Sequence, residues 1–178
     1  MELNSIKYNE SVFRELLKKQ PYYKTDISNS NIIFGNMEAS IRLTVFTNPH
    51  CMPCARMHAK IKDILNKYQD KLSIQYIFTS FNNELMDSSR FLIATYQNYS
   101  MKDTIDIYNK WFDKEMNNAK SYIAKTSINI HEKNVEYELL HHIEWKTKNK
   151  LLETPTILVN GYKLPSQYKI EDVIQILN

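Results

Sequence analysis

The sequence predicts an α/β protein in which a long helical segment separates two parts that contain strands. Three observations support this prediction. A short β-branched run, Ile41–Thr47, leads through a turn into apolar residues at helical spacing. A second apolar run follows Pro155 and ends at Asn160-Gly161, a pair typical of a tight hairpin turn. Between the two parts, residues 83–150 show helical periodicity throughout.

Composition excludes several classes of protein. The chain has 178 residues, of which 43% are hydrophobic and 24% charged, as expected for one globular domain with a substantial core. The net charge of +3 comes from 23 basic and 20 acidic residues, so we expect no nucleic-acid partner. Gly35 and Gly161 are the only glycines, which excludes both the Walker A and the Rossmann motifs. No apolar window is long enough to span a bilayer.

The two cysteines, Cys51 and Cys54, form a single Cys-x-x-Cys motif with three interpretations. A structural zinc site normally has four ligands. The histidines downstream of the motif are His58, His131, His141 and His142. Their spacing is not that of a zinc finger. A structural disulfide closing so short a loop would contribute little entropic stabilisation. The third interpretation is a redox dithiol, and the flanking sequence favours it.

The flanking residues place the dithiol between a strand and a helix. Ile41–Thr47 predicts a buried parallel strand, which the turn residues Asn48-Pro49 end. Cys51 then falls at a helix N-terminus, where free backbone N–H groups and the helix dipole lower a thiol pKa. The helix has apolar positions at Met57, Ile61, Ile64, Leu65 and Tyr68. Leu72–Phe78 predicts the next strand and completes a β-α-β unit.

This strand–dithiol–helix unit resembles the thioredoxin superfamily, and a second motif, Glu153–Gly161, strengthens the resemblance. Pro155 matches the family's proline, whose preceding peptide bond is cis and which lies beside the dithiol. The resemblance implies a thioredoxin-like fold, with βαβ and ββα halves around a central mixed sheet. The second half would be completed by a strand at Tyr162–Leu164 and a closing helix. The apolar face of that helix is Ile170, Val173, Ile174 and Leu177.

Residues 83–150 form an insertion that minimal thioredoxins lack, and the insertion resembles that of DsbA/DsbG-like proteins. Such domains also occur fused to vitamin K epoxide reductase-like enzymes. We expect an N-terminal extension at 1–31, a thioredoxin-like domain at 32–82 and 151–178, and the helical insertion between them. Ser100 with Asp103 predicts a capped helix start. The expected apolar stripes of the insertion are Phe91, Leu92, Thr95, Tyr96; Ile105, Tyr108, Trp111, Phe112; and Val135, Leu139, His142, Ile143. In the extension, Asn9–Lys19 predicts a helix with Val12 and Leu16 apolar.

The chain departs from the family at several positions near the dithiol. Val45 stands where thioredoxin has a buried acid, and His50 stands where it has a tryptophan. His50 either stabilises the thiolate or is simply exposed. The resemblance implies that Cys51 and Cys54 react, supported by Thr154, Pro155, His50, Met52 and Pro53. The backbone at Thr154 would bind an extended substrate segment. No cofactor and no metal are expected.

The resemblance implies a thiol–disulfide oxidoreductase in which Cys51 attacks and Cys54 resolves. Its direction, as reductase, oxidase or isomerase, is open. Expected partners are protein thiols and disulfides, together with a membrane redox partner of the vitamin K epoxide reductase-like or DsbB/DsbD-like kind, and we expect a monomer. Two alternatives remain: a non-catalytic binding module, or a copper- or zinc-handling protein that uses both cysteines and His58. We expect a periplasmic or extracytoplasmic fragment without its signal peptide or membrane anchor; a cytoplasmic location is the alternative.

Overall fold

The computed structural model describes residues 2–177, and the side chains of residues 5–177. A five-stranded mixed sheet lies at the centre, in the order β1-β3-β2-β4-β5. The strands are β1 (Ile33–Gly35), β2 (Ile41–Thr47), β3 (Leu72–Phe78), β4 (Thr156–Val159) and β5 (Tyr162–Lys163). The longer helices are α2 (Glu10–Lys18), α3 (Met52–Tyr68), α4 (Met86–Asn98), α5 (Met101–Asp113), α7 (Lys133–Asn149) and α8 (Ile170–Leu177). The short helical elements are α1 (Glu2–Lys7), η1 (Asn83–Leu85), η2 (Glu115–Asn118) and α6 (Ala119–Ala124).

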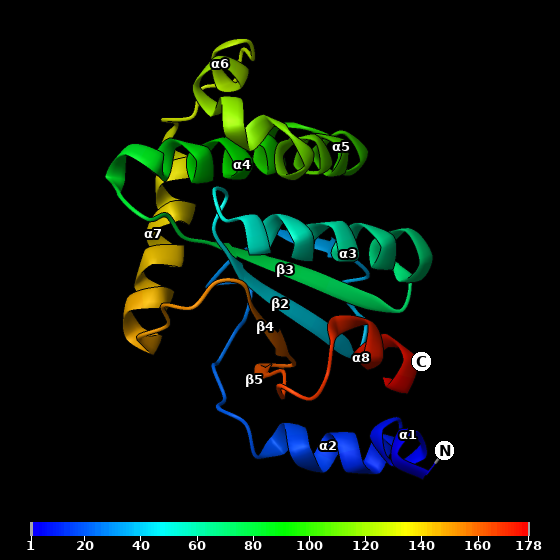
Figure 1. The fold of residues 1–178 in the computed structure, drawn as a ribbon. Coiled ribbons are helices and arrows are strands. Elements are labelled where there is room, and N and C mark those ends of the chain that lie inside the picture. The colour runs from blue at the N-terminus through cyan, green and yellow to red at the C-terminus, as the bar shows by residue number, and fades with distance from the viewer. Residues whose placement is uncertain (1, 178) are drawn as a thin grey trace.

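The predicted β-α-β unit is confirmed. β2 and β3 are parallel and paired along their whole length, from Ile41 opposite Leu72 to Thr47 opposite Phe78. Both strands have the predicted bounds, because they are buried on both faces and their side chains are almost entirely apolar or small. α3 connects them, so the carboxyl end of β2 leads into the N-terminus of α3 (Figure 1).

β1 was not predicted. It has only three residues and pairs antiparallel with β3, with Phe34 opposite Ile74. Gly35 follows at φ 83°, and a Cβ there would collide with the backbone carbonyl of Leu72. Glycine is therefore required at this turn by both conformation and space. A strand this short shows no periodicity in the sequence, which is why it was missed.

The second half of the sheet follows the expected plan. β4 lies antiparallel to β2, with Ile157 opposite Val45. Asn160 and Gly161 have φ 48° and 88° and make the hairpin turn into β5. α8 buries Ile170, Val173 and Ile174 as expected, and Ile176 in addition, while Leu177 is partly buried against the core.

The helices α4 to α7 lie between β3 and β4 in the sequence, and α4 and α5 extend over the dithiol end of α3 (Figure 1). Ser100 caps α5 as predicted, accepting a hydrogen bond from the Asp103 N–H at 3.1 Å. The third apolar stripe needs a correction: Val135, Leu139 and His142 are buried, but Ile143 is 38% exposed. Trp145 takes the inner position on the next turn of α7 instead.

The N-terminal segment packs on the edge of the sheet. The backbone N–H of Tyr23 donates to Gly161 O at 2.8 Å, and the Lys163 N–H donates to Pro21 O at 2.9 Å. The segment therefore covers the free edge of β5. In α2 the most deeply buried positions are Phe13 and Leu17, and Leu16, one of the expected apolar positions, is partly buried against the core beside them.

Candidate active site

The two cysteines lie at the point where β2 ends and α3 begins. Cys51 is the N-cap of α3, and its Sγ accepts a hydrogen bond from the Cys54 backbone N–H at 3.3 Å. Both are free thiols, and Cys51 is 7% exposed against 1% for Cys54. The sulfur of Cys51 thus accepts a hydrogen bond from a free N–H group of the helix start, an interaction that stabilises a thiolate. Of the two sulfurs it is also the more accessible to a partner.

Cys54 has a different environment one turn into the helix. Burial raises the pKa of its thiol to about 11, and a hydrogen bond to Cys51 acts in the same direction. The hydroxyls of Thr47 and Thr154 and the Asn48 N–H, which lies 3.5 Å from the sulfur, oppose this shift in pKa. Cys54 is therefore a thiol at neutral pH, able to donate its proton to Cys51.

The proline loop meets the dithiol across the end of the sheet. The Thr154–Pro155 peptide bond is cis. Both the carbonyl oxygen and the Oγ1 of Thr154 lie 3.8 Å from Cys51 Sγ, although the two residues are 103 positions apart. The antiparallel pairing of β4 with β2 brings them together, because it places the start of β4 beside the end of β2.

The two residues between the cysteines, Met52 and Pro53, lie in the first turn of α3. Met52 is the first residue of α3 and is 55% exposed beside Cys51. Pro53 follows in the first turn, where the missing N–H costs no helical hydrogen bond. Neither side chain offers a polar group to the sulfurs. Met52 instead presents an exposed apolar side chain next to Cys51.

His50 is tied to the helical insertion. Its Nε2 lies 2.7 Å from Ser88 Oγ on α4, its ring packs edge-on against Trp111, and burial lowers its pKa. The indole Nε1 of Trp111 donates to Pro49 O at 3.0 Å. The loop before Cys51 is therefore held by both α4 and α5. Sequence analysis assigned Trp111 to packing and did not identify Ser88, because no local pattern links residues so far apart.

His58 has a structural role inside the molecule. Its Nδ1 lies 2.7 Å from the Tyr76 hydroxyl and its Nε2 lies 2.9 Å from Asn109 Oδ1, and burial lowers its pKa to about 4. Both nitrogens are therefore engaged in joining α3 to β3 and α5. His58 is not free to join the cysteines as a metal ligand. Within the described part of the chain, no group of three or more His, Cys, Asp and Glu side chains could hold a metal ion.

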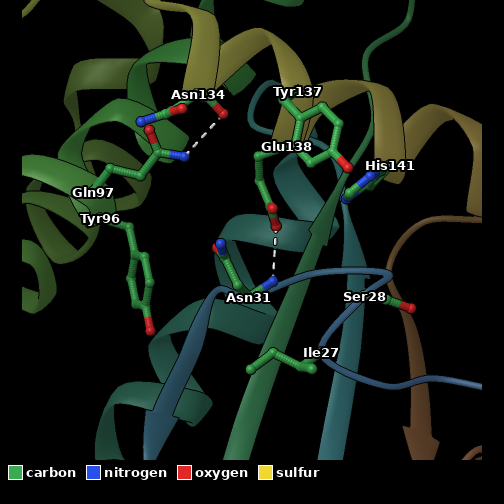
Figure 2. A pocket seen from close by; sticks show the side chains of 9 residues that line it. All are labelled: Ile27, Ser28, Asn31, Tyr96, Gln97, Asn134, Tyr137, Glu138 and His141. Carbon is green, nitrogen blue, oxygen red and sulfur yellow. Dashed lines mark hydrogen bonds between the residues drawn. The ribbon is translucent and has the colours of Figure 1, made fainter.

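A pocket away from the dithiol lies between the 27–31 loop, α4 and α7. This polar pocket has a volume of about 540 Å³, and none of the residues around the cysteines lines it. Figure 2 shows Glu138 pointing toward Asn31, whose N–H donates to Glu138 Oε1 at 2.8 Å. Gln97 similarly donates to Asn134 O at 3.1 Å. These polar groups bind one another and connect the helices around the pocket.

A dithiol at a helix N-terminus, facing a proline loop across the end of a mixed sheet, defines a thioredoxin-fold protein. Sequence comparison agrees with this class. The chain belongs to the thioredoxin family Thioredoxin_4, whose model matches residues 28–178. The expected fold and family are thereby confirmed.

Solved structures show the same fold at low sequence identity. Proteus mirabilis ScsC in a transitional conformation has a TM-score of 0.68 at 17% identity, covering 99% of this chain and 84% of its own. Oxidised BdbD from Bacillus subtilis has a TM-score of 0.65 at 14% identity, and the match covers 89% of this chain and 99% of BdbD. Reduced DsbA1 from Neisseria meningitidis has a TM-score of 0.63 at 13% identity, and the match covers 88% of this chain and 93% of DsbA1. No curated protein matches the chain. None of the helices within residues 2–177 has the length and apolar character needed to cross a membrane.

Proposed function

We propose that this thioredoxin-family protein exchanges disulfides with protein partners through Cys51 and Cys54. The observation that carries the proposal is the position of Cys51 Sγ. It accepts the Cys54 N–H at 3.3 Å and lies 3.8 Å from the Thr154 carbonyl. The helix start thus supplies donors for a thiolate, while the adjacent loop offers backbone for a partner strand.

The exchange has two steps that balance in atoms and electrons. The Cys51 thiolate attacks one sulfur of the partner's disulfide, and the other sulfur leaves as a thiolate. Cys54 then transfers its proton to the partner thiolate released in the first step, or to solvent, and attacks Cys51 Sγ, which releases the first partner sulfur as a thiolate. The partner gains two electrons, and the Cys51–Cys54 pair becomes a disulfide. In reverse, the same steps oxidise a partner dithiol, so the net direction depends on the protein that recycles the pair.

The other site residues serve to hold the partner and the loop. In this proposal the backbone at Thr154, fixed by Pro155, pairs with an extended substrate segment. Met52 contacts the segment, and Pro53 begins the helix without needing an N–H. His50 is a positioning residue, since its ring is bound by Ser88 on α4.

The recycling partner and the location belong to the same proposal. We place the reactive domain at residues 32–82 and 151–178, with the insertion at 83–150 covering it. The chain would act as a monomer outside the cytoplasm and exchange electrons with a membrane protein of the vitamin K epoxide reductase-like or DsbB/DsbD-like kind. Its two cysteines both belong to the dithiol, so no third thiol is available to mispair in an oxidising compartment.

Trapping of mixed disulfides tests the proposal. The wild-type protein should reduce insulin in the presence of dithiothreitol. Cys54→Ser should accumulate mixed disulfides with partner proteins, while Cys51→Ser should trap none, because it lacks the attacking sulfur. The zinc and copper content of the purified protein should be measured in the same set of experiments. Stoichiometric zinc or copper that is lost on substituting either cysteine, together with no disulfide exchange, would support the metal-handling alternative instead.

A further inference from the structure

A groove of about 440 Å³ lies between α3 and α5, beside the dithiol. It begins at Met52, the residue after Cys51, and its apolar surface includes Ala55, Ala59 and Phe112. Phe112 is 4% exposed and stacks on the His58 ring at 4.6 Å, so this wall is rigid. The groove is therefore a fixed apolar channel that starts at the reactive end of the molecule.

Three basic side chains surround the groove. Arg56 and Lys62 come from α3 and Lys110 from α5, whereas Asp113 is the only acidic residue that lines it. Among residues 5–177, no carboxylate lies within ion-pair distance of any of these three cations. Lys60 differs: it also projects from α3, but it pairs with Glu171 at 2.9 Å. The groove thus carries a net positive charge, with three cations against the single carboxylate of Asp113.

We propose that this groove binds an acidic, partly apolar segment of the partner polypeptide next to its reactive cysteine. The inference rests on the proposed function and names the substrate class of the same site. A chain whose disulfide reaches Cys51 passes Met52 and enters the groove directly. From Met52 to Lys62 the helix rises about 15 Å, which accommodates roughly four or five extended residues. Apolar side chains would cover the channel, and carboxylates would meet the three cations.

Three synthetic peptides test the substrate class with the protein as it exists. All contain the same small disulfide loop, followed by four residues that alternate leucine with glutamate, glutamine or lysine. We expect kcat/KM to fall in that order at low salt. The glutamate and lysine peptides should differ by about tenfold, because each exposed ion pair contributes only a few-fold. Added sodium chloride should reduce the difference, since it screens exposed charges.

Charge reversal locates the effect. Lys62→Glu with Lys110→Glu should invert the preference, so that the lysine peptide becomes the better substrate. The matched control is Lys67→Glu with Lys102→Glu, one exposed residue on each of the same helices outside the groove, which should keep the wild-type preference. Far-ultraviolet circular dichroism checks that each variant folds. The wild-type peptide series needs no variant, so it tests the substrate class even if the groove variant is unfolded.

The outcomes separate the two proposals. If the wild-type protein reduces neither insulin nor the small uncharged hydroxyethyl disulfide, the proposed function is wrong. If it reduces hydroxyethyl disulfide but turns over all three peptides equally, the function stands and the groove inference is overturned. The inference is also overturned if the peptides differ but the control variant inverts the preference as strongly as the groove variant.

Discussion

The indole Nε1 of Trp111 donates a hydrogen bond to the carbonyl oxygen of Pro49 at 3.0 Å, across 62 residues of sequence. Trp111 is fully buried, and its ring also packs against His50, whose Nε2 is bound by Ser88. The helical insertion therefore holds the two residues that precede Cys51. In this protein the insertion is a structural part of the dithiol site as well as a cover over the sheet.

Trp111→Phe tests this connection. The ring would still pack, but the Pro49 carbonyl would lose its buried donor, at a cost of about 1–3 kcal/mol in the free energy of unfolding. The loop would also loosen, so the alkylation rate of Cys51 should change. Trp145→Phe is the matched control, because its Nε1 donates to Lys24 O at 2.9 Å and its ring packs against Tyr23 and Phe46. If both variants change Cys51 alkylation equally, Trp111 has no specific link to the site.

Cys54 should react with an alkylating agent only at high pH. Burial raises the pKa of Cys54 to about 11, so iodoacetamide should label only Cys51 in the reduced protein at neutral pH. Labelling of Cys54 should increase only as the pH approaches about 11, measured by mass spectrometry of proteolytic peptides. Labelling of Cys54 ahead of Cys51 at about pH 7 would contradict the assigned roles.

His58 should make the folded state acid-sensitive. Burial lowers its pKa from 6.5 to about 4, so the unfolded chain binds a proton more readily between these values. The free energy of unfolding therefore has its full value above about pH 6.5, where His58 is neutral in both states, and decreases as the pH falls toward 4. At about pH 5 the loss is about 2 kcal/mol, and the lowered pKa of buried His142 acts in the same direction.

Urea unfolding at a series of pH values measures this effect. His58→Gln should flatten the dependence of unfolding free energy on pH, because the titrating group is gone while an amide can still hydrogen-bond. Equal slopes for wild type and His58→Gln would mean that His58 does not control the acid sensitivity.

Gly161→Ala should weaken the attachment of the N-terminal segment. Gly161 has φ 88°, and a Cβ there would press on the Tyr22 ring and the Tyr23 carbonyl. We expect a loss of about 1–3 kcal/mol and faster proteolysis near Tyr22. The cost should be smaller in a Tyr22→Ala background, which removes the ring. An unchanged cost in that background would place the effect in the backbone conformation of Gly161 and its contact with the Tyr23 carbonyl, not in the Tyr22 ring.

Local patterns in the sequence determined the elements that carry the dithiol. β2 and β3 have the predicted bounds, since a buried parallel strand is a continuous run of apolar or small residues. The turn at Asn48-Pro49 and the helical spacing after Cys51 then fixed the start of α3. Each of these signals acts over a few neighbouring residues. The sequence by itself therefore determined the place of the dithiol at a helix N-terminus.

Only the tertiary structure decided which distant groups surround that site. Thr154 approaches Cys51, Ser88 binds His50, and Asn109 binds His58 because the sheet and the insertion pack in one particular way. Periodicity shows which face of a helix is buried, but it does not specify which residue lies opposite. The face itself can be misassigned by one position, as at Ile143, because side chains at the edge of a stripe are buried only if a neighbouring element covers them.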